Sequence, residues 1–123
     1  MGELRKTWQN TKKWSDDVAS GKIKFDFSGT DAGVTKSLIK SFSNGFGPAL
    51  DKVEKAYKAK NDAETKKTAA AALTIAESYE KGITKAKGQL AAASYANFHV
   101  IIGSLITKLT ELKTKGAAAK VDI

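Results

Sequence analysis

The large apolar residues between Tyr95 and Leu112 recur at alternating intervals of three and four positions, and this spacing constrains the fold more than any other feature of the chain. It places their side chains along one side of an α-helix and forms a coiled-coil-like seam against other helices. The residues of this seam are Tyr95, Phe98, Ile102, Leu105, Leu109 and Leu112. The pattern predicts a helix at the centre of a helical fold and indicates no chemistry.

The chain is expected to be all-α, either a small helical bundle or a long helical hairpin. One short segment near residues 22–28 departs from this pattern, because charged and apolar residues alternate there and Ile23, Phe25 and Phe27 face one side. Such alternation is the period of a half-buried strand, yet no second segment of this kind exists to pair with it. We expect an extended linker that holds its phenylalanines against the helices. The alternative is a strand that pairs with another chain.

The whole chain, residues 1–123, fits one helical domain that buries a core without a metal or a disulfide. Residues 1–47 hold two N-terminal helices and the extended segment between them. Two glycines and the only proline, Pro48, then mark a boundary. Residues 48–116 are expected to form a long helical hairpin, and residues 117–123 a frayed tail.

The sequence does not decide whether one helix or two helices cover residues 58–67, because this stretch is polar on all sides. Asn61, with Glu64 three positions later, resembles a capping box and favours a break there. The apolar faces before and after the gap stay in phase, which favours one continuous helix. We place the reversal of the chain between residues 79 and 89, and we expect Gly116 to end the last helix.

The first helix, over residues 3–19, carries Trp8 and Trp14 on its apolar face together with Leu4 and Val18. One interpretation places both indoles in the core, with their N–H groups at its edge. The other is an interface with a partner or a membrane, because large aromatic anchors dominate many interfaces.

Catalytic chemistry has no support in the sequence. There is no cysteine, which excludes disulfides, thiolate zinc sites and a thiol nucleophile. His99 is the only histidine and lies in the most apolar part of the chain, without the second ligand of an HExxH or ExxH pattern. No glycine-rich phosphate loop or nucleophile motif occurs. We therefore expect no enzyme, no catalytic or metal-binding residue, no cofactor and no small-molecule substrate.

The protein is basic, with a net charge of +8 that raises the possibility of a nucleic-acid partner. The excess is spread evenly, at +3 for residues 1–47, +3 for residues 48–87 and +2 for residues 88–123. Arg5 is the only arginine, whereas phosphate clamping and base readout favour arginine. These features favour lysines on solvated helix faces over a nucleic-acid site.

No signal peptide or transmembrane helix is expected. The first residues are polar, and the apolar stretch from Phe98 to Leu112 is interrupted by Thr107 and Lys108 and is shorter than the roughly 20 residues of a bilayer span. The compartment is unknown, and cytoplasmic is the default expectation.

The function best supported by these patterns is non-enzymatic association through helix faces, with a second copy or with another protein. Residues 100–102 place apolar groups on several sides of one helix, which neighbours have to cover, and the small residues at 91–96 allow a second helix to approach closely. The candidate interaction residues are Trp8, Trp14, Ile23, Phe25, Phe27, Phe98, Ile102, Leu105, Leu109 and Leu112. Two alternatives stay open: a membrane-active protein that exposes residues 97–112 at a lipid surface, and a sequence-independent nucleic-acid binder.

Overall fold

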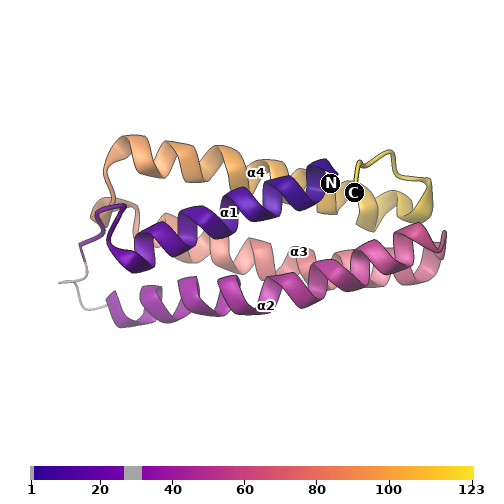
Figure 1. The fold of residues 1–123 in the computed structure, drawn as a ribbon, viewed down its shortest axis with the longest axis horizontal. Coiled ribbons are helices and arrows are strands. Elements are labelled where there is room, and N and C mark those ends of the chain that lie inside the picture. Colours follow the sequence, from indigo (N-terminus) through magenta and orange to yellow (C-terminus); the bar gives the residue numbers. More distant parts are fainter. Residues whose placement is uncertain (1, 27–31) are drawn as a thin grey trace.

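The computed structural model describes residues 2–26 and 32–123 and shows four α-helices in them (Figure 1). The helices are α1 (Glu3–Ser20), α2 (Ala32–Lys58), α3 (Asp62–Lys85) and α4 (Ala92–Lys115), and short 3-10 turns η1 (Lys87–Gln89) and η2 (Gly116–Ala118) follow α3 and α4. The prediction of a small all-α bundle is confirmed.

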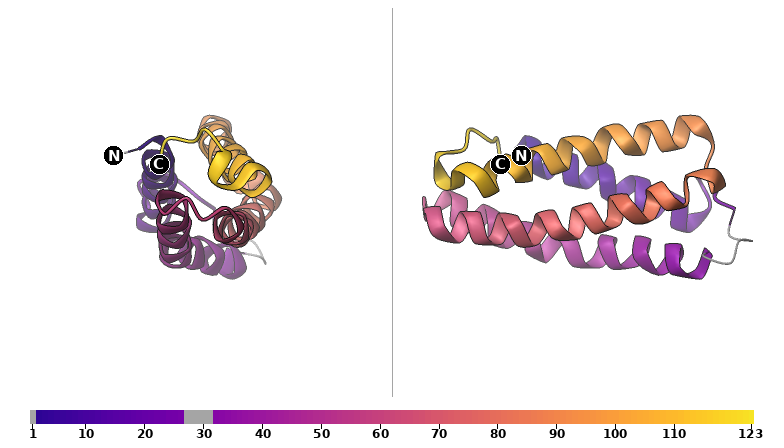
Figure 2. Two further views of the ribbon diagram at one scale, coloured as in Figure 1. Left: turned by 90° about the vertical axis from the view of Figure 1, so that its right-hand side faces the viewer. Right: turned by 180° about the vertical axis from the view of Figure 1, so that it is seen from behind.

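The helices alternate in direction and surround one core (Figures 1 and 2). α2 packs against α3, α3 against α4, and α1 closes the bundle by packing against both α4 and α2. α1 and α3 are therefore diagonal to one another. The first helix begins at the predicted residue and ends at Ser20, one residue later than predicted. Gly21 caps this end, and its φ of 86° is a left-handed conformation that glycine adopts without strain.

The seam predicted from Tyr95 to Leu112 faces the core. Its last five members are all buried: Phe98, Ile102, Leu105, Leu109 and Leu112. The inward side of α3 is small by comparison, because Ala69, Ala72 and Ala76 occupy it. Small residues on one helix leave room for large side chains from its neighbours, which is how a core reaches dense packing.

Aromatic side chains fill that room and join all four helices in a closed ring of contacts. The centroid distances are 5.3 Å for Trp8–Phe42, 4.0 Å for Phe42–Tyr79, 5.3 Å for Tyr79–Phe98 and 4.7 Å for Phe98–Trp14. The first and third of these pairs are edge-on, an arrangement that is favourable beyond the apolar area it buries, while Phe42–Tyr79 is stacked and Phe98–Trp14 is tilted. The ring fixes the relative positions of the helices near the middle of the bundle.

The boundary predicted at Pro48 is wrong, because α2 continues through it to Lys58 (Figure 1). A proline inside a helix removes the hydrogen bond to the carbonyl four residues earlier, here that of Asn44. Both residues are exposed, so water can replace the missing donor. Phe42, Phe46 and Leu50 stay in register on the buried side across this point, and their packing outweighs the local break.

The continuous helix favoured across residues 58–67 is also wrong. α2 ends at Lys58, and Asn61 caps a new helix by accepting a hydrogen bond from the backbone N–H of Glu64 at 3.1 Å. The break predicted at Asn61 is therefore confirmed, but only the N-cap half of the capping box forms, because the N–H of Asn61 donates to the carbonyl of Ala56 at 3.0 Å and not to the side chain of Glu64. The chain reverses again over residues 86–91, which overlaps the end of the interval expected for that reversal.

The segment after α1 is extended and packs on the bundle, as predicted for Ile23 and Phe25; Phe27 lies outside the described residues. Phe25 forms a single antiparallel bridge with Leu90, and the N–H of Asp26 donates to the carbonyl of Gln89 at 3.0 Å. Both Ile23 and Phe25 are partly buried against the core. The extended residues before α4 thus supply the partner that the sequence pattern did not reveal.

The prediction of a frayed tail over residues 117–123 is wrong. Ala119 and Val121 are buried, and the hydroxyl of Tyr57 donates to the carbonyl of Ala119 at 2.5 Å. The N–H of Leu4 donates to the carbonyl of Asp122 at 2.8 Å, which places the two chain ends side by side (Figure 1). The tail folds over the end of the bundle because it covers apolar surface that the four helices leave open there.

Candidate interaction surfaces

Most of the candidate interaction residues lie inside the single chain rather than on its surface. Seven of them are at most 4 % exposed: Trp8, Trp14, Phe98, Ile102, Leu105, Leu109 and Leu112. They hold the bundle together and offer no face to a partner while it is folded. A surface for association has to come from other residues.

Both tryptophans are core residues, as one interpretation predicted, but the N–H of Trp14 does not lie at the edge of the core as that interpretation expected. Trp8 packs against Phe42 and Phe46, and Trp14 packs against Phe98. The indole N–H of Trp14 is buried, and no described residue accepts a hydrogen bond from it. Truncating Trp8 would open the core itself, so that variant cannot serve as a probe of assembly.

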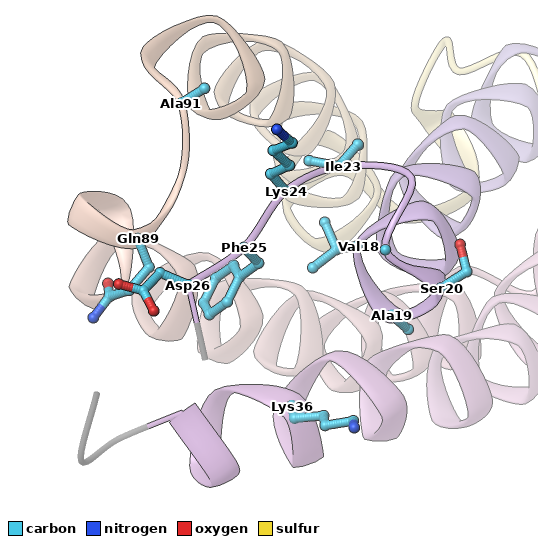
Figure 3. A pocket seen from close by; sticks show the side chains of 11 residues that line it. Val18, Ala19, Ser20, Ile23, Lys24, Phe25, Asp26, Lys36, Gln89 and Ala91 are labelled. Atoms are coloured by element: carbon cyan, nitrogen blue, oxygen red, sulfur yellow. The ribbon is translucent and has the colours of Figure 1, made fainter. Parts of the chain in front are cut away.

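The extended segment borders a hollow of about 640 Å³ at the end of α1 (Figure 3). Its lining includes the apolar Val18, Ile23 and Phe25. In Figure 3 the two lysines of the lining lie far apart, Lys24 on the extended segment and Lys36 on α2. The charged groups of this hollow do not converge on one point, and convergence is what a catalytic or ligand-binding set requires.

The most buried polar pair also lacks access to a substrate. The hydroxyls of Ser15 and Tyr79 hydrogen-bond to each other across the core, and both residues are fully buried. Burial raises the pKa of Tyr79 above its ordinary value, because the phenolate would be desolvated there, and the hydrogen bond from Ser15 opposes this only in part. The pair is a structural contact between α1 and α3.

Metal-binding side chains do not gather in the described part of the chain, where no three histidine or carboxylate residues come together. His99 is exposed on α4 and stacks against Tyr95 with ring centroids 6.1 Å apart. Among the carboxylates, that of Asp16 on α1 forms an ion pair with Lys12 at 2.8 Å. These contacts are ordinary for a helix surface.

The outer side of α4 is the surface that differs most from the rest of the molecule. From Gly88 to Thr107 the chain has no Asp, Glu, Lys or Arg, although such residues make up 28 % of the sequence. Val100 is 69 % exposed at the middle of this face. The other outward residues are small or polar and continue a second series at intervals of three and four: Ala93, Ala96, Gly103 and Thr107. We call these five residues the α4 outer face.

A shallow hollow of about 290 Å³ lies beside the α4 outer face, between α1 and α4. Its lining includes the half-buried Ile23 and Ile101, the exposed Asn10 and Asn97, and two charged residues of α1, Lys13 and Asp17. Ile23 was among the predicted interaction residues, whereas Ile101 and Val100 were not. The sequence of residues 100–102 indicated apolar side chains on several sides of the helix. Only the positions of the neighbouring helices show which of these three side chains is exposed.

Comparison of the chain with protein-family models, with curated proteins and with solved structures found no match. Among the described helices, none is both long and apolar enough to cross a membrane.

Proposed function

We propose that this protein is a non-enzymatic assembly protein that binds a second copy of itself through the α4 outer face. The observation that carries the proposal is the 20-residue interval from Gly88 to Thr107, which has no charged residue and yet exposes Val100 on a surface rich in lysine. Depletion of charge at the centre of a surface patch is the compositional mark of an interface.

The shape of this face supports helix-to-helix contact. Ala93, Ala96 and Gly103 present little or no side chain, so the backbone of a second helix can approach closely. A methyl group added at Gly103 would meet nothing within 4 Å in the single chain, so the fold itself does not require a glycine there. A twofold contact would place each α4 outer face against its copy, with Val100 near the centre.

A second copy suits this face better than a charged ligand does. Association of two molecules that each carry +8 needs a contact region without lysines, and the α4 outer face is such a region. Half-buried Ile23 and Ile101 border it and add apolar surface, in a hollow that also contains one charge of each sign, on Lys13 and Asp17.

The test is sedimentation of wild type and Val100→Lys across a range of protein concentrations. We expect the wild-type mass to rise toward a dimer, and Val100→Lys to weaken dimerisation by about tenfold or more, because a twofold contact would bring the two new lysines together. Val100 is exposed, so the substitution leaves the core intact.

The matched control is Gln9→Lys, which adds the same charge at an exposed position of α1 and should associate like wild type. A wild-type protein that stays monomeric at every concentration contradicts the proposal. If that monomer binds neutral vesicles and Val100→Lys weakens this binding, the membrane alternative replaces it, because that alternative places residues 97–112 in the lipid surface. If it binds single-stranded DNA with an affinity that falls steeply with salt, the nucleic-acid alternative does.

A further inference from the structure

A groove runs along the outside of α2 and α3, on the side of the pair turned away from α1 and α4. Its widest part, about 790 Å³, has a floor of small and apolar side chains. They are Pro48, Ala49, Ala56, Ala71 and Ile75. This floor is independent of the α4 outer face and lies on different helices.

The groove continues toward the start of α2 through a second hollow of about 320 Å³. The two hollows share Gly45 and Ile75, and the second is also lined by Ser41 and Ser78. From Leu38 to Ala59 the groove follows α2 for about 32 Å at the rise of an α-helix. That length matches a docked helix of roughly 20 residues and far exceeds a small metabolite.

The charges at the wide end are unbalanced. Lys52, Lys55 and Lys67 line it with a single carboxylate, that of Glu64. Within the described chain no carboxylate lies close enough to form an ion pair with any of these three lysines. The wide end of the groove therefore carries uncompensated positive charge above an apolar floor.

Arg5 explains why one of the groove lysines, Lys55, is unpaired. Its guanidinium binds the carboxylates of both Asp51, at 2.6 Å, and Glu54, at 2.7 Å. Asp51 is four residues before Lys55 and would otherwise be its natural partner on the helix surface. By drawing the acidic side chains of this part of α2 toward α1, Arg5 leaves the opposite side of α2 positive.

We propose that this groove binds an amphipathic helix of another protein, one that has small or aliphatic residues on its buried stripe and Asp or Glu beside them. Helices recognised in this way lay their apolar face along a groove between two helices. The alanines of the floor allow the backbone of the docked helix to approach closely. The acidic residues beside its apolar stripe would meet Lys52, Lys55 and Lys67. A second copy of this chain is a poor occupant, because its net charge is +8.

The test uses the full chain as bait for a displayed library of helical peptides about 20 residues long, the length that the groove accommodates. We expect the selected peptides to share an apolar stripe flanked by Asp or Glu. A representative synthetic peptide should then lose about tenfold or more in affinity for Lys52→Glu/Lys55→Glu, because like charges would face each other.

Two further variants separate the groove from general charge. Ala71→Phe fills the floor at an exposed helix position and should weaken the peptide about tenfold while leaving helicity by circular dichroism unchanged. Lys6→Glu/Lys13→Glu makes the same change of charge on exposed positions of α1 and should have little effect.

The proposal is overturned if no acidic amphipathic peptide is selected, or if the selected peptides bind Ala71→Phe as tightly as wild type. It is also overturned if a single-stranded oligonucleotide or an anionic vesicle, and no peptide, binds in a way that Lys52→Glu/Lys55→Glu abolishes. A failure of dimerisation in sedimentation would leave this result untouched, since the α4 outer face takes no part in the groove.

Discussion

The hydrogen bond between Ser15 and Tyr79 joins the two diagonal helices, α1 and α3, inside a core that is otherwise almost entirely apolar. Both hydroxyls are shielded from water, and each is the partner of the other in the folded chain. Removing one hydroxyl leaves the other unsatisfied wherever no second partner is within reach, and this costs more than the bond itself contributes. The two single substitutions and the double substitution therefore measure what this contact does for the fold.

The two single variants should differ, because only one of the two hydroxyls has a substitute partner. In α1, the hydroxyls of Thr7 and Thr11 each donate to the backbone carbonyl four residues earlier, at 2.8 and 2.9 Å. After Tyr79→Phe, Ser15 can turn in the same way to the carbonyl of Thr11. We expect that variant to lose only about 0.5–1.5 kcal/mol, the net value of one hydrogen bond.

Ser15→Ala leaves the Tyr79 hydroxyl buried without a partner. The desolvation penalty is about 1–3 kcal/mol, and the higher helix propensity of alanine returns about 0.5 kcal/mol. In the double variant no polar group is left unsatisfied. Its loss should therefore be smaller than the sum of the single losses, by about 1 kcal/mol.

The assay is urea unfolding followed by circular dichroism, with the free energy of unfolding extrapolated to water for wild type and the three variants. Equal slopes in all four proteins would show that the comparison is valid. Additive losses, or a Ser15→Ala variant as stable as wild type, would refute the claim that this bond is a coupled buried contact.

Two further predictions follow from the core. Burial raises the pKa of Tyr79 in the folded state, so the neutral phenol favours folding. This contribution to the free energy of unfolding is fully present below pH 10, the ordinary tyrosine pKa. Above pH 10 it falls by about 1.4 kcal/mol per pH unit. Tyr79→Phe should lack this part of the alkaline loss, and identical pH profiles of unfolding free energy would contradict it. Leu105→Ala should cost about 2–5 kcal/mol in urea unfolding, since Leu105 is fully buried, and a loss below about 1 kcal/mol would exclude a central position for α4.

The parts of the fold that the sequence predicts are those in which large apolar residues repeat. Five consecutive members of the α4 seam are buried, and the same periodicity located α1. A single residue such as Pro48 predicts less, because its effect is local. The cost of one missing hydrogen bond on an exposed turn is smaller than the packing of Phe42, Phe46 and Leu50 on the other side of the same helix.

Contacts between segments far apart in the sequence could not be predicted from the hydrophobic pattern. Leu90 pairs with Phe25, and residues 119–122 close the end of the bundle through Tyr57 and Leu4. Each of these contacts depends on which helix ends lie next to each other, and that follows only from the assembled bundle. The polarity of residues 58–67 indicated a solvated stretch, and the cap at Asn61 makes this stretch the junction of two helices.

The two surfaces that we propose for association were not predicted, for a related reason. Large side chains are the usual candidates for an interface, but in a chain of this size they are first needed for the core. On its outer side α4 carries a second series at intervals of three and four, in which Val100 is the one large apolar residue and Ala93, Ala96 and Gly103 are small; α2 likewise has the small Ser41 and Gly45 four positions apart on its outer side. Small residues contribute little to hydrophobic periodicity, yet they set how closely another helix can approach. The inner series specifies the bundle, and the outer series leaves two helical surfaces with different charge, one neutral and one positive, which is why we assign them to two different partners.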